Sequence, residues 1–143
     1  MKVFVNGTFD LLHRGHIELL NYAKKIGEDL INDPIRSPNH VCVGIDTDDR
    51  VKEMKGSTRP IHNQEERKFF LENLKAVDEV RFFSNDKELE GLVKSFKPDI
   101  MIVGSDWKEK SVIGSYYAAE LIFFDRIGDY ATTKTIQDII DRG

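Results

Sequence analysis

Short apolar runs alternate with helical patterns along the 143 residues of the chain. Runs of this kind, separated by amphipathic stretches, are typical of a parallel sheet with helices on both faces. The sequence therefore predicts a Rossmann-like, doubly wound α/β fold built on a parallel five-stranded sheet. The predicted strands are Lys2–Asn6, Val41–Asp46, Glu79–Phe83, Ile100–Gly104 and Leu121–Phe124.

Four amphipathic stretches are predicted as helices that connect or follow these strands. Asn63 and Glu66 form an N-x-x-E capping signal at the start of the second, and Pro98 ends the third because proline cannot continue a helix. Apolar residues at helical spacing define the buried side of each helix. They are Leu19, Ala23, Ile26 and Leu30; Phe70, Leu74 and Val77; Leu89, Leu92, Val93 and Phe96; and Ile136, Ile139 and Ile140.

The length of the chain is typical of one domain with a substantial core, and we expect a single domain over residues 1–143. Within it, Asn32–Asn39 contains two prolines and no periodicity, so this segment is predicted to be an exposed loop inserted after the first helix. Cys42 lies in an apolar run and is predicted to be a packed core thiol rather than a reactive one.

Charge and hydropathy narrow the class of protein. Lys and Arg number 21 against 25 Asp and Glu, for a net charge of −4, which does not favour a nucleic-acid partner. The sequence has neither a signal peptide pattern nor an apolar run of membrane-spanning length, so we expect a cytoplasmic protein with no membrane partner. Because the net charge is negative, any phosphate site must be built from basic residues that lie close to it.

Residues 7–16, GTFDLLHRGH, carry the most specific chemical signal. They follow an apolar strand directly, and His13 and His16 lie on the same side of a helix start. Backbone N–H groups at a glycine turn and at the positive end of a helix favour anions, and imidazoles donate hydrogen bonds to phosphate oxygens. The block therefore predicts a nucleotide site.

This block resembles the GTFDxxHxGH element of the nucleotidyltransferase superfamily that includes glycerol-3-phosphate cytidylyltransferases and heptose-1-phosphate adenylyltransferases. The resemblance implies that His13 and His16 stabilise the phosphates of the nucleotide during transfer. The alternative is a capped helix whose histidines are surface polar groups. The other residues of the block expected at the nucleotide are Gly7, Thr8, Phe9 and Gly15.

Polar clusters follow four of the five predicted strands. In open α/β sheets, ligands bind beyond the carboxyl ends of the strands, where the strand order reverses. We therefore expect these clusters to converge on one site. They are Gly7–Thr8, Asp46–Asp48, Gly104–Trp107 and Arg126–Thr133.

The last of these clusters, RIGDYATTK, resembles the RTxGISTTK element of cytidylyltransferases. The resemblance implies that Arg126 and the helix start at Thr132 and Thr133 hold the outer phosphates of the triphosphate. The chain departs from the pattern at Asp129, which adds a negative charge in place of glycine, and at Ala131, which removes a serine hydroxyl. The alternative is a C-terminal helix that the threonines simply cap.

The segment KGSTRPIHNQEERK, residues 55–68, resembles the KGxxRPxxxxxxR stretch of heptose-1-phosphate adenylyltransferases. The resemblance implies that a lysine in a mobile loop meets the phosphates during transfer, and a flexible ammonium suits that role. Lys55 is the candidate and Lys52 the alternative. Arg59 and Arg67 are candidates for the phosphate of the acceptor, with a solvated basic face as the alternative for Arg59.

GSDW, which begins at Gly104, resembles the GxDW of glycerol-3-phosphate cytidylyltransferases. Backbone groups around Gly104 are suited to reading the edge of a base, and Asp106 is expected at the nucleotide. The Trp107 indole is suited to stacking on a base or to walling a pocket, with core packing as the alternative. VIGS at 112–115 resembles instead the IAGS of the heptose enzymes.

These resemblances imply a nucleotidyltransferase in which a phosphate oxygen of a polyol or sugar phosphate attacks the α-phosphorus of CTP or ATP and releases pyrophosphate, with Mg²⁺ accompanying the triphosphate. Arg126 and GSDW slightly favour a cytidylyltransferase, for example one that acts on glycerol 3-phosphate. KGSTRP and VIGS favour a sugar-1-phosphate adenylyltransferase. FAD synthesis from FMN and ATP, and a non-catalytic nucleotide-binding module, are further alternatives. The resemblance also implies a homodimer, with LKAVDEV at 74–80 near its interface.

Overall fold

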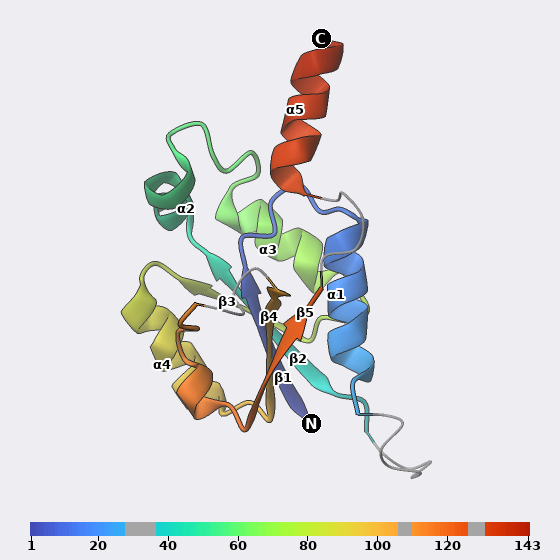
Figure 1. The fold of residues 1–143 in the computed structure, drawn as a ribbon, viewed down its shortest axis with the longest axis vertical. Helices are drawn as coiled ribbons and strands as arrows, with labels where there is room; N and C mark the ends of the chain where they lie inside the picture. Colours follow the sequence, from blue (N-terminus) through green and yellow to red (C-terminus); the bar gives the residue numbers. More distant parts are fainter. Residues whose placement is uncertain (28–36, 106–109, 126–130) are drawn as a thin grey trace.

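The computed structural model describes residues 1–27, 37–105, 110–125 and 131–143. It contains a five-stranded sheet with the strand order β3-β2-β1-β4-β5, in which all four pairings are parallel (Figure 1). The predicted sheet is thereby confirmed, and every strand end lies within one residue of its prediction. The strands are β1 (Lys2–Gly7), β2 (His40–Asp46), β3 (Glu79–Phe83), β4 (Ile100–Gly104) and β5 (Glu120–Phe124).

The helices that pack on the sheet divide between its two faces (Figure 1). On one face, Val3 and Val41 pack in a core with Leu20 of α1 and Leu71 of α3. On the other, Phe4 packs with α4 side chains, because successive residues of a strand point to opposite faces. The helices are α1 (Arg14–Lys25), α2 (Asp48–Lys55), α3 (Gln64–Glu72), α4 (Asp86–Phe96) and α5 (Thr132–Arg142), with a 3₁₀ turn, η3, at Ser115–Tyr117.

The centre of the sheet is tightly packed around Phe4 and Cys42. Gly44 of β2 leaves the room that the Phe4 ring occupies, since a Cβ at this position would lie 2.8 Å from a ring carbon. Cys42 is 2% exposed, and burial raises the pKa of its thiol to about 12. Its prediction as a packed core thiol is confirmed.

The region around the second and third helices differs from its prediction. Helix α3 begins as predicted, because the Asn63 side chain accepts a hydrogen bond from the Glu66 N–H at 2.9 Å. It ends at Glu72, however, and it buries Arg67 and Leu71 rather than Phe70, which is 39% exposed. Polar helix α2, which contains Lys55, was not predicted because only one of its residues, Val51, is buried.

Two other predictions also need correction: the buried side of the last helix and the exposed loop after the first helix. Ile139 and Ile140 were expected on the buried side of the last helix, but both are 63% exposed, because α5 projects away from the sheet (Figure 1). The predicted loop insertion lies largely outside the described residues. Its last residue, Asn39, is 1% exposed rather than on the surface, and its amide donates to the carbonyls of Ala23 and Ile26.

Across the described ranges, no helix combines the length and the apolar character that crossing a membrane requires.

Candidate active site

The loop from β1 to α1 follows an unusual backbone path. Phe9 and Leu11 both have positive φ angles, 52° and 51°, which bulky residues rarely adopt. The Phe9 ring is buried beside Gly7, where a Cβ would lie 3.1 Å from it. Strained backbone of this kind persists where the surrounding structure holds it, and it clusters at functional sites. Here it brings the chain to the start of α1, where Gly15 lies in the first turn.

The two histidines of the predicted site lie together at this helix start. His13 is the N-cap of α1, and its ring stacks on the His16 ring with centroids 3.8 Å apart. The His13 backbone N–H donates to Nδ1 of His16 at 3.2 Å. Because this bond uses Nδ1 as an acceptor, the ring proton of neutral His16 lies on Nε2. His16 therefore presents an N–H donor on the side of the ring opposite the helix cap.

The charge state of His16 follows from its surroundings. Burial, and after it the nearby His13 and Lys55, lower its pKa from 6.5 to about 4, against the opposing effect of Asp10. His16 is thus a neutral hydrogen-bond donor at neutral pH. The same interactions show that His13, His16 and Lys55 share one electrostatic neighbourhood.

This pKa predicts how stability depends on pH. Between pH 6.5 and about 4, the unfolded chain binds a proton at His16 that the folded chain does not, so stability falls as the pH falls through this range. Urea unfolding at pH 7.5 and 4.5 should show that the wild type loses about 2–3 kcal/mol more than His16→Gln, which has no imidazole at position 16. Equal losses in the two proteins would show that His16 titrates normally.

Lys55 lies at the end of a helix rather than in a loop. It is the last residue of α2, and Gly56 ends the helix with a φ of 101°. Partial desolvation and the neighbouring Arg59 lower the pKa of its ammonium, while Asp46 and Asp10 oppose them. An arriving anion would relieve this repulsion, so Lys55 is placed to respond to a phosphate.

A cavity of about 310 Å³, here called the sheet-end cavity, opens where the strand order reverses between β1 and β4. It is lined by the ends of these two strands (Asn6–Thr8, Val103 and Gly104), by Asp46, by Arg50, Met54 and Lys55 of α2, and by Phe83, Leu89, Val112 and Ile113. Predicted site residues Gly7, Thr8, Lys55 and Gly104 therefore meet at one cavity. The histidines are not among its lining residues.

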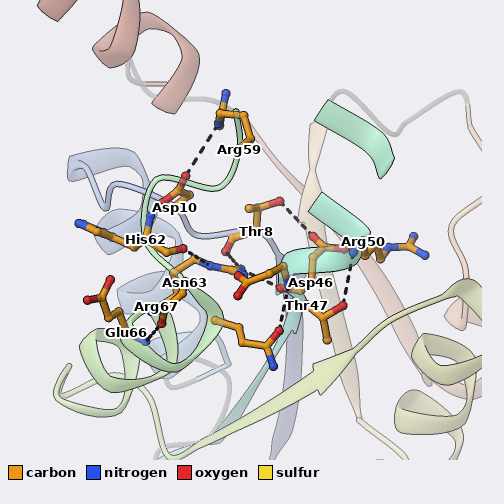
Figure 2. Close-up of polar contacts among 12 residues, drawn as sticks. Thr8, Asp10, Asp46, Thr47, Arg50, Arg59, His62, Asn63, Glu66 and Arg67 are labelled. Atoms are coloured by element: carbon orange, nitrogen blue, oxygen red, sulfur yellow. Dashed lines mark hydrogen bonds and ion pairs between the residues drawn. The ribbon is translucent and has the colours of Figure 1, made fainter. Parts of the chain in front are cut away.

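Asp10 ties two distant segments to the histidine loop, and Figure 2 shows its contact with the segment that follows α2. Its carboxylate, 1% exposed, accepts hydrogen bonds from the backbone N–H groups of Ile61 and His62 and lies 3.8 Å from Nε of Arg59. The Thr132 hydroxyl donates to the Asp10 carbonyl. The start of α5 and the segment after α2 thus both lie against the loop that carries the histidines.

Arg67 corrects one of the predictions. We expected it to bind the phosphate of the acceptor, but its side chain is fully buried and all of its bonds are to the protein (Figure 2). It donates to the carbonyls of His62, Thr8 and Asp46 and to the carboxylate of Asp48, at 2.8–3.0 Å. Arg67 therefore joins the ends of β1 and β2 to α2 and α3, out of reach of a ligand.

The remaining predicted residues stand as follows. Arg59 is mostly buried, and its Nε and one Nη atom have no hydrogen-bond partner among the residues that the structure describes. Thr133 is exposed in the first turn of α5, after an N-cap, Ala131, that makes no side-chain bond. The predictions for Asp106, Trp107, Arg126 and Asp129 fall outside the described residues.

Sequence reasoning did not select several residues of the site. Asp10 stands inside the GTFD motif, so the motif already contained it. Arg50 lies in α2 and Asp46 ends β2, so the spacing rule for ion pairs on a helix did not indicate this pair; the Arg50 Nε donates to Asp46 at 2.8 Å and its Nη2 to Asp86 at 2.8 Å. Asn6 carried no signal, because a single amide at the end of a strand is common.

A parallel sheet of this strand order, with paired histidines at the start of the helix that follows its first strand and a lysine in the same electrostatic neighbourhood, fits the nucleotidyltransferase that the sequence resemblance implied. The chain belongs to the cytidylyltransferase-like family, whose pattern it matches over residues 4–125. It is a nucleotidyltransferase.

Two similar proteins are both named bifunctional protein HldE. The one from Helicobacter hepaticus is 39% identical over 96% of this chain and 26% of its own length, and the one from Sulfurimonas denitrificans is 42% identical over 96% and 26%. The chain thus spans about a quarter of the length of these relatives. The crystal structure of the lipopolysaccharide core biosynthesis protein from Thermoplasma volcanium shares the fold, with a TM-score of 0.62 and 24% identity over 92% of this chain and 98% of that one.

Proposed function

We propose that this chain transfers a nucleoside monophosphate from ATP to the phosphate of a sugar phosphate and releases pyrophosphate. The sequence alone leaned slightly to CTP and a polyol phosphate. The HldE relatives support the adenylyltransferase alternative instead. The observation that carries the proposal is the shared neighbourhood of His13, His16 and Lys55 beside a cavity at the carboxyl end of the sheet.

The proposed chemistry needs no general base. An oxygen of the acceptor phosphate, already an anion, forms a bond to the α-phosphorus while the bond from that phosphorus to the β-phosphate oxygen breaks, and pyrophosphate leaves with the electron pair. Catalysis is then positioning and charge stabilisation. His16 donates its Nε2–H to a phosphate oxygen, His13 lies beside it, and the Lys55 ammonium offsets the charge on the transferred group. We assign the departing pyrophosphate to Arg126.

We propose that Mg²⁺ enters with the triphosphate. Within the part of the chain that the structure describes, no three His, Cys, Asp or Glu side chains are grouped to hold a metal ion. Triphosphate oxygens supply the hard ligands that Mg²⁺ prefers. When bound, the ion would neutralise part of the charge of the phosphates.

We also propose that residues 1–143 form a single domain and that the protein is a homodimer. Arg59 is the proposed contact for the phosphate of the acceptor.

A pyrophosphate-release assay tests the proposal directly. ATP and CTP are each offered with a hexose 1-phosphate, a heptose 1-phosphate and glycerol 3-phosphate, with Mg²⁺ present. We expect release with ATP and a sugar 1-phosphate to exceed release with CTP and glycerol 3-phosphate by at least tenfold. The reverse order would restore the cytidylyltransferase interpretation. Nucleotide binding without release in any pairing would indicate a non-catalytic nucleotide-binding module.

Two lysines of α2 give this assay its matched control. Lys55 lines the sheet-end cavity and Lys52 does not. Lys55→Met should lower the rate at saturating substrates at least tenfold, because it removes a cation placed at the transferred group. Lys52→Met, the same change one turn earlier on the same helix, should retain the wild-type rate. If Lys52→Met is the slower variant, the assignment of the lysine is wrong.

A further inference from the structure

Two carboxylates attract the Lys55 ammonium, and neither of them binds it. Asp46 and Asp10 both favour the charged form of this lysine. Within the part of the chain that the structure describes, however, Lys55 forms no ion pair with either carboxylate. Other groups occupy the oxygens of both carboxylates, and the ammonium stays available for a ligand.

The two carboxylates are occupied in different ways. Those of Asp10 accept the backbone N–H groups of Ile61 and His62, at 2.7 and 3.0 Å, so the fold itself holds them. Asp46 is held by side chains instead (Figure 2). Its Oδ1 accepts from Nε of Arg50 at 2.8 Å, and its Oδ2 accepts from the Thr8 hydroxyl at 3.0 Å. One cation, Arg50, therefore decides whether Asp46 has an ion-pair partner.

Arg50 is fixed at both ends of its guanidinium. Its Nη2 donates to Asp86, in the first turn of α4, at 2.8 Å, and the guanidinium lies over the Phe83 ring at 5.2 Å. The side chain is only 14% exposed. Arg50 is thus held against Asp46 before any ligand arrives, which lowers the entropic cost of the ion pair.

Arg50, Asp46 and Lys55 all line the sheet-end cavity. Without the guanidinium, the Asp46 carboxylate would keep only its bond to the Thr8 hydroxyl, although its side chain is just 11% exposed. A largely buried charge without an ionic partner is costly. Lys55 is a cation that Asp46 already attracts, so it is placed to fill the position that Arg50 leaves.

We propose that Arg50 is a positioning residue for Lys55: by occupying Oδ1 of Asp46, it prevents that carboxylate from capturing the ammonium that the transferred phosphate needs. The inference rests on the proposed function for the role of Lys55. It gives Arg50 a role that acts through Asp46 rather than through contact with the reacting atoms.

Arg50→Met tests the inference with and without the competing carboxylate. The single variant should lower kcat for pyrophosphate release at least tenfold, because the paired ammonium no longer meets the transferred group, and should leave KM for the nucleotide within about threefold. Adding Asp46→Asn removes the charge that captures Lys55 and should raise kcat at least threefold above that of Arg50→Met. If Arg50 served only to hold α2, the double variant would stay as slow, because Asn restores none of the bonds of Arg50.

Three further variants show which part of Arg50 matters. Arg50→Lys keeps a cation against Asp46 and should keep kcat within about threefold of the wild type. Asp86→Asn, at a carboxylate that is 67% exposed, releases only the far end of Arg50 and should keep kcat within about twofold. Arg81→Met is the matched control, because it removes an arginine whose ion pair is 60% exposed at the guanidinium, and its kcat should match the wild type. A loss in Asp86→Asn as large as in Arg50→Met would overturn the inference.

The ionisation of Lys55 gives a second readout that needs no turnover. Reductive ¹³C-methylation of the lysines and NMR titration report its pKa, with Lys55→Met to assign the signal. Burial and Arg59 lower this pKa in the wild type. Arg50→Met should raise it, because an ammonium paired with a carboxylate holds its proton more firmly, and adding Asp46→Asn should lower it again.

The two readouts separate this inference from the proposed function. If the wild type transfers nucleotide and Arg50→Met retains its kcat, the inference fails and the proposed function stands. If no acceptor is turned over, but the pKa of Lys55 rises in Arg50→Met and falls again with Asp46→Asn, the proposed function fails and the control of Lys55 by Arg50 stands. If Arg50→Met is slow and Asp46→Asn restores neither kcat nor the pKa, Arg50 acts through α2 alone and the inference is wrong.

Discussion

Replacing His16 by Ala is expected to lower kcat by about a hundredfold or more. The neutral ring presents its Nε2–H beside Lys55, so it can stabilise charge on a phosphate oxygen as it develops. Removing one such donor from a preorganised site commonly raises the barrier by about 3–4 kcal/mol. The measurement is steady-state pyrophosphate release at saturating nucleotide and acceptor, because the lost interaction belongs to the transition state and should lower kcat more than it raises KM.

A second variant separates chemistry from folding at this position. Nδ1 of His16 also accepts the His13 backbone N–H at 3.2 Å, so His16→Ala removes a helix cap as well, at about 0.5–2 kcal/mol of stability. Gln at the same position reaches back with its Oε1 to the N-cap N–H in a capping box, but it has no imidazole ring to hold an N–H donor where the Nε2–H of His16 lies. His16→Gln should therefore regain stability relative to His16→Ala without regaining kcat.

His40→Ala is the matched control for both variants. His40 lies at the opposite end of the sheet, where it is half exposed and pairs with Glu79 at 3.0 Å. Its removal should leave kcat within twofold of the wild type. Recovery of kcat in His16→Gln would show that the reaction does not need the imidazole ring.

The sheet could be predicted from sequence because parallel strands buried on both faces have near-continuous apolar runs. Each predicted strand end lies within one residue of the structure for this reason. Helix α4 was equally clear, since Leu89 and Val93 are both buried. The apolar residues within each of these elements are enough to specify it, so the pattern along the chain predicts the element directly.

Elements whose burial depends on distant partners could not be predicted in the same way. Arg67 takes a core position that an apolar residue usually fills, so the buried side of α3 was wrongly assigned to Phe70, although Leu74 and Val77 of the same predicted stripe do pack in the core after the helix ends. The isoleucines of α5 gave a clear stripe, Ile139 and Ile140 among them, yet α5 projects from the sheet (Figure 1). Hydropathy shows which residues favour burial but not whether a neighbour covers them.

The candidate site could likewise be predicted only in part from the sequence. The motif located the histidines, because their spacing alone places both rings at one helix start. The motif did not show that Asp10 binds the backbone after α2, or that Arg50 crosses from Asp46 to Asp86, since these contacts join residues up to 52 positions apart. A buried network is a property of the fold, and one sequence contains only the types of its members.

Arg67→Met is expected to lower the free energy of unfolding by about 3–5 kcal/mol, the usual effect of removing one partner of a buried charged network. The variant keeps an unbranched apolar stem but leaves the carbonyls of Thr8, Asp46 and His62 without their donor. It also leaves the Asp48 carboxylate without its ion pair. Urea unfolding followed by circular dichroism measures the loss. Arg67→Lys should fall between the wild type and Arg67→Met, because an ammonium reaches fewer of these oxygens.

Arg81→Met is the matched control for the loss of stability expected in Arg67→Met. Arg81 bonds to Glu79 at 2.6 Å, but its side chain is 60% exposed, so Arg81→Met should lower stability by less than about 1 kcal/mol. Both variants remove a guanidinium and an ion pair, and they differ in burial and in the backbone carbonyls that only Arg67 binds. Equal losses would mean that water satisfies those carbonyls once the guanidinium is gone. The ends of β1 and β2 would then be held together by the apolar core and the sheet hydrogen bonds, without help from Arg67.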